Sequence, residues 1–300
     1  MASLRDIRKH ISSVKSIKQI TYAMKMVAAA RIKRAQNSIL ASRPFAREME
    51  HMIADLYTEM ETEDFNSSPA HALFESRKGA GSAGLVLITS DKGLAGSFNT
   101  NLLKNAVAWL RANKDKKIYA VCVGRKGRDF LKRLKGVDLE IVNEMVGIFP
   151  KVSYVHANLL AEHITRLYAD RGVESVTLVY NEFKSLIAQR VVNAGLLPLK
   201  RHILELSGPA GGSFRDFDFE PDKLKLLEAL LPRYIGAQLY RILLESQAAE
   251  LAARMNAMES ASKNACELIE GLTLKLNKMR QAMITTELNE IVSGAEALGG

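Results

Sequence analysis

The stretch of the sequence that comes nearest to a chemical site is SDKGLAGSFN, residues 90–99, which follows the apolar run GLVLITS. A strand that ends in a glycine-containing turn and leads into a helix can bind phosphate, because the N–H groups of a helix N-terminus attract anions. The spacing matches neither the GxxxxGK[ST] phosphate loop nor the GxGxxG dinucleotide motif. We interpret Gly93 and Gly96 as parts of a structural turn, with nucleotide binding by an α/β enzyme as the alternative.

The other side chains that carry out chemistry do not gather in the sequence. His156 and His163 are two helical turns apart, whereas a helical metal site needs ligands one turn apart. Cys122 and Cys266 form no CxxC pair, which favours a reducing compartment without a disulfide framework. No GxSxG motif occurs, and neither cysteine has a base nearby in the sequence. The sequence therefore predicts no catalytic residue, no metal site and no cofactor.

Positive charge is concentrated at the start of the chain. Residues 1–50 contain eleven Lys or Arg against three Asp or Glu, which supplies +8 of the formal net charge of +9. Such a segment is compatible with a nucleic-acid arm, a transit peptide, a face for an acidic partner, or a solvated helix face. It has no stacking aromatic residues between its charges and its periodicity continues past the usual length of a transit peptide. A partner-binding helix is the preferred interpretation, and a basic coiled-coil adaptor for nucleic acid is its rival.

The first 57 residues have the periodicity of one long helix, interrupted at Pro44. Apolar residues recur every three or four positions, which places them on one helical face. The predicted stripe consists of Leu4, Ile7, Ile11, Val14, Ile17, Ile20, Met24 and Val27. Successive steps of three make this stripe drift around the helix. A helix of this length, about 80 Å at 1.5 Å per residue, must lie against a partner helix.

The last eighty residues supply that partner. Residues 222–291 show no strand pattern, and their middle, SQAAELAARMNAMESASKNAC, is as rich in small residues as YAMKMVAAARIKRAQ near the start. The predicted stripe of this helix consists of Leu230, Ile235, Leu239, Ile242, Ser246, Ala249, Ala253, Asn256, Ser260, Leu268, Leu272, Leu276, Met279 and Met283. We expect an antiparallel coiled coil of close-lying helices, with two separate amphipathic helices of a bundle as the alternative.

Between the long helices, strand and helix patterns alternate. GLVLITS, IYAVCVG and SVTLVYNEF are short β-rich runs, and helical patterns lie between them. This alternation predicts a three-layer, Rossmann-like α/β domain with a mainly parallel sheet. The predicted domains are an N-terminal coiled-coil helix (residues 1–60), a central α/β domain (61–215) and a C-terminal coiled-coil helix (216–300) that pairs with the first.

The C-terminal sequence ITTELNEIVSGAEA resembles the signature of the γ subunit of F-type ATP synthases, I-T-x-E-x-x-E-x-x-x-G-A-x-A. The resemblance covers nearly the whole chain. It includes IRKHISSVKSIKQITYAMKMVAAARIKRAQ, ITSDKGLAGSFNTN and ESQAAELAARMNAM, in the order that the family has them. Pro232, in LPRY, departs from the family's RRY-type sequence and puts an unbroken final helix in question.

The resemblance implies a rotary shaft for ATP synthesis and proton transport that is not itself an enzyme. The paired helices would stand inside a ring of α and β subunits, and the α/β domain would seat on the ring of membrane c subunits beside the ε subunit. Membrane association would come through these partners alone, on the cytoplasmic side of a bacterial inner membrane, and no nucleic acid would bind. The resemblance is to the bacterial type. The chain lacks the cysteine-bearing insertion of the chloroplast branch, so we expect no thiol switch.

The resemblance also assigns roles to individual residues. Met24 in YAMKM, Arg254 in AARM, and Gln281 and Thr285 in QAMIT correspond to the family's contacts with the β subunits. Glu220 and Asp222 in FEPD correspond, less directly, to a segment near the c ring.

Overall fold

The computed structural model describes residues 3–58, 65–66, 68–75, 77, 79–149, 151–200 and 222–298. The chain divides into two compact units. Unit 1 combines Met1–Ala29 with Arg254–Gly300, and unit 2 is Ala30–Ala253. The predicted domain boundaries near residues 60 and 215 lie outside the described residues.

Two long helices, α1 (Leu4–Thr58) and α6 (Lys223–Leu298), pass through both units. Ser3 and Asp6 cap the start of α1, since the Asp6 carboxylate accepts from the Ser3 amide at 3.0 Å and the Ser3 hydroxyl accepts from the Asp6 amide at 3.2 Å. Pro44 and Pro232 lie inside these helices, and neither residue ends its helix. The prediction of two long helices is confirmed, and the Pro232 departure leaves α6 unbroken.

In unit 1 the face of α1 that packs against α6 differs from the predicted stripe. The buried positions follow a strict seven-residue repeat: Ile7, Val14, Thr21 and Ala28. Ile17, Ile20 and Val27, predicted to be packed, are 51%, 59% and 52% exposed. The prediction is wrong here because a coiled-coil seam keeps to 3.5 residues per turn, whereas steps of three carry a stripe away from it.

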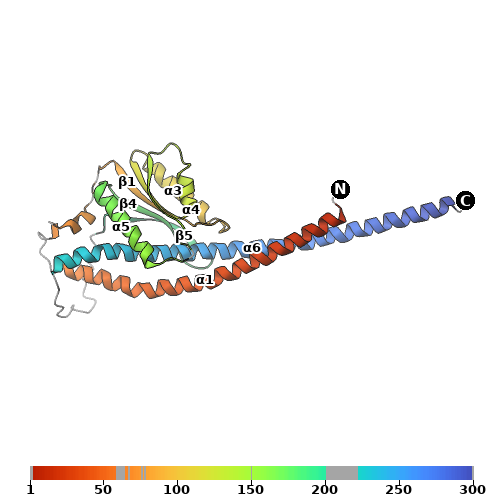
Figure 1. The fold of residues 1–300 in the computed structure, drawn as a ribbon, viewed down its shortest axis with the longest axis horizontal. Coiled ribbons are helices and arrows are strands. Elements are labelled where there is room, and N and C mark those ends of the chain that lie inside the picture. Colours follow the sequence, from red (N-terminus) through yellow and green to blue (C-terminus); the bar gives the residue numbers. More distant parts are fainter. Residues whose placement is uncertain are drawn as a thin grey trace. The chain divides into compact units, whose positions relative to one another are not determined.

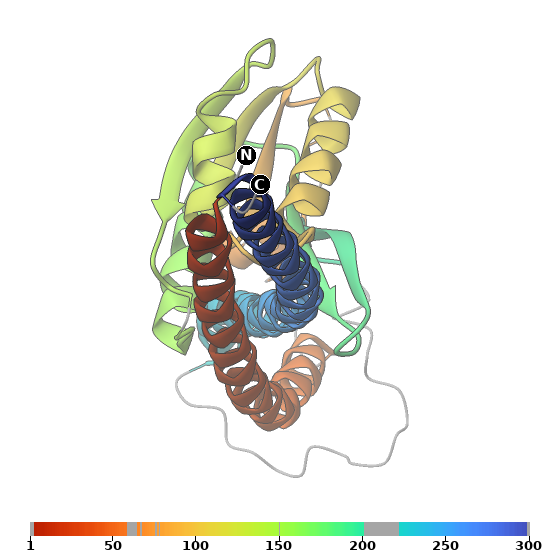
Figure 2. The same cartoon turned by 90° about the vertical axis from the view of Figure 1, so that its right-hand side faces the viewer.

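The same correction applies to α6. Met258 and Ala265, seven residues apart, are buried in unit 1, whereas the predicted seam residues Ser260 and Leu268 are exposed. An ion pair of 2.8 Å joins Lys25 of α1 to Glu259 of α6. Figures 1 and 2 show the two helices side by side in this unit.

In unit 2 alanine and larger aliphatic residues share the contact between the same helices. Ala35 and Ile39 of α1 form a buried cluster with Leu244 and Ala248 of α6. Farther along α1, Glu50 meets Gln238, which lies farther back on α6, so the helices are antiparallel in unit 2. The predicted antiparallel coiled coil with alanine in its seam is confirmed.

A five-stranded sheet with the order β3-β2-β1-β4-β5 lies in the described part of unit 2. Its strands are β1 (Ser82–Ile88), β2 (Lys117–Val123), β3 (Leu139–Met145), β4 (Val176–Phe183) and β5 (Gln189–Leu197). The pairs of β1 with β2, β1 with β4 and β2 with β3 are parallel, and β5 runs antiparallel to β4. A continuous apolar burial pattern along β1 fits a strand that is covered on both faces.

Helices cover both faces of this sheet, as Figure 1 shows. One core holds side chains of α3 (Phe98–Ala112) and α4 (Arg125–Leu131) against β1 and β2. The other core holds α5 (Tyr154–Asp170), the 3₁₀ helix η1 (Pro69–Leu73) and the residues of α6 from Leu227 to Leu243. The predicted three-layer α/β architecture is confirmed, and α6 forms part of one layer.

Candidate functional site: exposed faces of the long helices

The glycine-containing loop after β1 is held by its own side chains. Asp91 accepts hydrogen bonds from the backbone N–H of Arg125, where α4 begins, and of Gly147, each at 3.0 Å. The Asn99 amide donates to the Ser90 hydroxyl at 2.8 Å. The Asp91 carboxylate thus stands where an incoming anion would meet these N–H groups. This arrangement favours a structural turn over a phosphate site.

One glycine beside this loop is required by close packing. Gly124 has a φ of +92°, and a Cβ atom there would lie 2.1 Å from the carbonyl oxygen of Thr89. The Thr89 hydroxyl accepts from the Gly127 amide at 2.8 Å, which ties the start of α4 to the end of β1. GRKG is therefore a packing motif between a strand and a helix.

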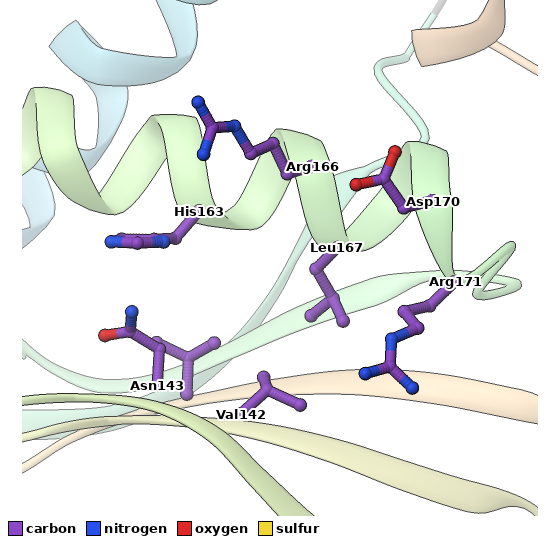
Figure 3. Close-up of a pocket in the computed structure, with 8 residues that line it drawn as sticks. Val142, Asn143, His163, Arg166, Leu167, Asp170 and Arg171 are labelled. Atoms are coloured by element: carbon purple, nitrogen blue, oxygen red, sulfur yellow. The ribbon is translucent and has the colours of Figure 1, made fainter.

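The two histidines of α5 have different surroundings. His156 accepts at Nδ1 from the Ser153 amide, 3.2 Å away, and completes the N-terminal cap of the helix. His163 lines a pocket of about 160 Å³ between α5 and β3 (Figure 3). Among the described residues, no group of three or more His, Cys, Asp or Glu could hold a metal ion.

The two arginines that line that pocket are already engaged. Arg166 pairs with Glu162 at 2.6 Å, and Figure 3 shows its side chain pointing away from the strands. Arg171 lies 3.8 Å from Glu140 and over the ring of Tyr119. The pocket is therefore a gap at the edge of the sheet rather than a candidate site.

The apolar residues that leave the seam of α1 form an exposed stripe. Ile17, Ile20, Met24 and Val27 follow one another at steps of three and four, and only Met24 is half-buried. Met24 thus lies between two exposed apolar neighbours and beside Lys25, which pairs with α6. Apolar residues gathered on an exposed helix face mark a surface for a partner.

The end of α6 forms a second exposed surface. The Lys25–Glu259 pair places Leu4 of α1 opposite residue 280 of α6, because both lie 21 residues from that pair on antiparallel helices. Residues 281–295 are exposed, and in Figure 1 this end of α6 extends past the N-terminus within unit 1. Its apolar side chains are 47% to 67% exposed: Met283, Ile284, Leu288, Ile291 and Val292.

Three of the predicted contact residues, Met24, Gln281 and Thr285, lie on these surfaces. Gln281 and Thr285 lie on the exposed end of α6, where the Thr285 hydroxyl donates to the Gln281 carbonyl at 3.0 Å. Arg254 is half-buried at the first position of α6 that belongs to unit 1. Asp222 is exposed and caps the start of α6 by accepting from the Leu224 amide at 3.2 Å. Glu220 lies outside the described residues.

Sequence reasoning missed the separation between the seam and the stripe. The seven-residue repeat of Ile7, Val14, Thr21 and Ala28 was the available signal, but it is hidden because Thr21 is polar. The basic residues from Arg5 to Lys18 are exposed, so positive charge accompanies the apolar stripe. No helix in the described part of the chain is long and apolar enough to cross a membrane.

The chain is similar to gamma chains of ATP synthases over its whole length. The family model described as ATP synthase matches residues 3–298. The ATP synthase gamma chain of Elusimicrobium minutum is 48% identical, with 99% of each chain covered. That of an Anaeromyxobacter species is 44% identical, with 99% of this chain and 100% of the relative covered.

Solved structures show the same fold. A chain of the Euglena gracilis mitochondrial ATP synthase in rotational state 3 matches with a TM-score of 0.66 at 20% identity, covering 98% of this chain and 94% of that chain. A chain from the central stalk and c-ring structure of the Tetrahymena thermophila mitochondrial ATP synthase matches with a TM-score of 0.58 at 29% identity, covering 81% and 99%. The chain therefore belongs to the family of ATP synthase gamma chains.

Proposed function

We propose that this ATP synthase gamma chain is the central rotary shaft that couples proton flow through the membrane sector to ATP synthesis on the catalytic β subunits. The observation that carries the proposal is the exposed apolar surface of unit 1, which comprises the stripe from Ile17 to Val27 and the end of α6 from Gln281 onwards. Family membership favours this function over a nucleic-acid adaptor or a nucleotide-binding enzyme.

The paired helices would stand inside a ring of alternating α and β subunits. A shaft in a bore must be thin, and the contact of Ala35 and Ala248 lets the helices approach closely. The apolar stripe follows one side of α1, so the surface of unit 1 differs around its circumference. As the shaft turns, each β subunit meets a different side in sequence and changes conformation with it.

Charge would help the shaft turn without locking in place. The exposed basic residues from Arg5 to Lys18 suit acidic loops on the surrounding subunits. Charge complementarity acts over several ångströms and tolerates rotation better than interlocking side chains do. The nucleotide chemistry takes place on the partner subunits, because a gamma chain is a non-catalytic subunit of the complex.

The finer assignments come from the family resemblance. Met24, Arg254, Gln281 and Thr285 would contact the β subunits, and Glu220 and Asp222 would lie near the c ring. The α/β domain would seat on the c ring beside the ε subunit. These contacts would hold the chain on the cytoplasmic side of a bacterial inner membrane.

Reconstitution tests the proposal. Purified α and β subunits are assayed for ATP hydrolysis with and without the chain. We expect cooperative turnover only in the mixture that contains the chain, because the shaft puts the three β subunits in different states. Equal, non-cooperative hydrolysis in both mixtures would contradict the proposal.

The assigned contacts have their own test in the same assay. Gln281→Ala should lower turnover several-fold, since an interfacial polar contact contributes about 1 kcal/mol. The exposed position of Gln281 predicts an unchanged melting temperature of the isolated chain. Asn289→Ala, on the same exposed segment, is the matched control. If Gln281→Ala unfolds the chain, or if both variants turn over like the wild type, Gln281 is not a contact.

A further inference from the structure

The apolar seam between α1 and α6 leaves their relative axial position weakly determined. Burial of apolar surface has no direction, so it stabilises many registers of two long helices. At Ala35 and Ala248 the side chains in the seam are short, and the larger Ile39 and Leu244 beside them are apolar. A polar contact inside an apolar seam is the usual device that fixes one register.

Such a contact lies farther along the same pair of helices, inside unit 2. One carboxylate oxygen of Glu50 on α1 accepts from the Gln238 side-chain amide at 2.9 Å and from the Tyr234 hydroxyl at 3.3 Å on α6. The two donors lie one helical turn apart, so they hold the carboxylate from two levels of α6. Met49 and Ile53, the neighbours of Glu50 on α1, are buried in the same apolar core.

The alternatives to this register are unfavourable. A slide of one turn would take Glu50 away from one donor and bring it to Leu230 or Ile242, which occupy the next positions on the same face of α6. These two residues are only 8% and 4% exposed. The half-buried carboxylate would then exchange one of its hydrogen-bond donors for an apolar neighbour, which is unfavourable for a charged group.

Tyr234 is suited to its part in this contact. Its side chain is buried, and burial together with the negative charge of Glu50 raises the pKa of the hydroxyl above its usual range. The hydroxyl therefore keeps its proton and remains a donor to Glu50 at physiological pH.

From these contacts we infer that Glu50 is a positioning residue of the rotary mechanism: held by Tyr234 and Gln238, it pins α1 against sliding along α6 when the shaft carries torque. The inference rests on the proposed function, since torque on one helix of a coiled coil becomes shear between the two. The Glu50 contact should matter less when the shaft turns without opposing torque than when it turns against a proton gradient.

The register is measured on the full chain with spin labels at two exposed positions of unit 2, Asn37→Cys and Arg233→Cys, in a background without Cys122 and Cys266. Wild type and Glu50→Gln, which retains an oxygen acceptor, should give one interlabel distance. Glu50→Leu should add distances shifted by about 5.4 Å, the rise of one turn. A single unshifted distance in Glu50→Leu would overturn the inference.

Coupling is measured on the complete complex in sealed vesicles, as protons pumped per ATP hydrolysed. We expect Glu50→Leu to lower this ratio at least threefold, with hydrolysis in leaky vesicles near the wild-type rate. Glu48→Leu, an exposed position two residues away, is the matched control and should pump like the wild type. Tyr234→Phe, which removes a single donor, should cause a smaller loss and serves where Glu50→Leu does not assemble.

The outcomes distinguish a failure of this inference from a failure of the proposed function. Full coupling in both Glu50→Leu and Tyr234→Phe would overturn the inference about Glu50. It would not contradict the proposed function as a rotary shaft. An equal loss of hydrolysis in leaky and sealed vesicles would show that Glu50 is needed for the stability of the fold. This result would also overturn the inference. A wild-type complex that hydrolyses ATP without pumping would instead count against the shaft.

Discussion

Ile20 and Ile32 lie on the same helix but on different surfaces, and this difference gives the first prediction. Ile32 is 2% exposed, whereas Ile20 is 59% exposed. Ile32→Ala should lower the free energy of unfolding by about 2–5 kcal/mol, because it empties a packed position. Ile20→Ala should change it by about 0.5 kcal/mol or less. Denaturant unfolding of the isolated chain measures both.

For assembly with the α and β subunits, Ile20 should matter more than Ile32. Ile20→Ala should weaken association with the α and β subunits, because the exposed stripe faces them on our proposal. An Ile20→Ala chain that is less stable but assembles fully would show that the stripe packs within the chain instead.

The two cysteines give a prediction about reactivity and pH. Burial, with the charge of Glu144 adding to it, raises the pKa of the Cys122 thiol to about 12, and Cys266 is only half-buried. A thiol reagent at pH 8 should therefore modify one cysteine in the folded chain and two in denaturant. Rapid labelling of both thiols in the folded chain would contradict the burial of Cys122.

The sign of the pH effect on stability follows from the same group. The folded chain holds the Cys122 proton up to a pH of about 12, whereas an unfolded thiol loses it near 9.0. The folded state thus binds more protons between these values, and the contribution of Cys122 to stability falls as the pH rises above 9.0. Cys122→Ala should remove this part of the alkaline slope.

At the scale of elements, the turn between β2 and α4 depends on one glycine. Gly124→Ala would place a Cβ atom 2.1 Å from the Thr89 carbonyl oxygen at a φ of +92°, so it should destabilise the chain by more than about 1 kcal/mol. Gly93→Ala is the control, since a Cβ atom there meets nothing within 4 Å. Equal melting temperatures for the two variants would contradict the requirement for glycine in the turn between β2 and α4.

The elements also show how far sequence reasoning reaches. The two long helices and the strands β1, β2 and β4 followed from sequence patterns, because these strands are nearly continuous buried apolar runs. Strand β3 was not predicted, because most of its residues are only half-buried and it forms no such run. The seam did not follow, since apolar residues such as Ile20 and Val27 obscure a repeat that includes Thr21. Hydrophobicity marks residues that avoid water, but it does not distinguish a face that packs within the chain from one that awaits a partner.

Contacts between distant residues were the least predictable part. Glu50 stands 184 residues from Tyr234 in the sequence, and its hydrogen bonds depend on the register of two helices. The same holds for Asp91, which joins Arg125 to Gly147. The roles of Met24, Arg254, Gln281 and Thr285 came from the family resemblance and remain predictions.

Across the whole molecule, the same two helices have two uses. In unit 1 they expose apolar and basic surface, and in unit 2 they pack against a sheet and carry the Glu50 contact. A rotating shaft needs both properties, because one part must be gripped by partners while another part receives torque. On our proposal, the two units of the chain correspond to these two parts of the shaft.

Rotation itself is the most direct test of this account. A complex of the chain with α and β subunits is fixed to a surface through the β subunits. A bead is attached to the α/β domain through an exposed cysteine introduced at Lys114, in a chain without Cys266. The account predicts that ATP turns the bead in one direction, in steps of one third of a turn for three β subunits. A bead that stays still, or moves at random, while the complex hydrolyses ATP cooperatively would contradict it.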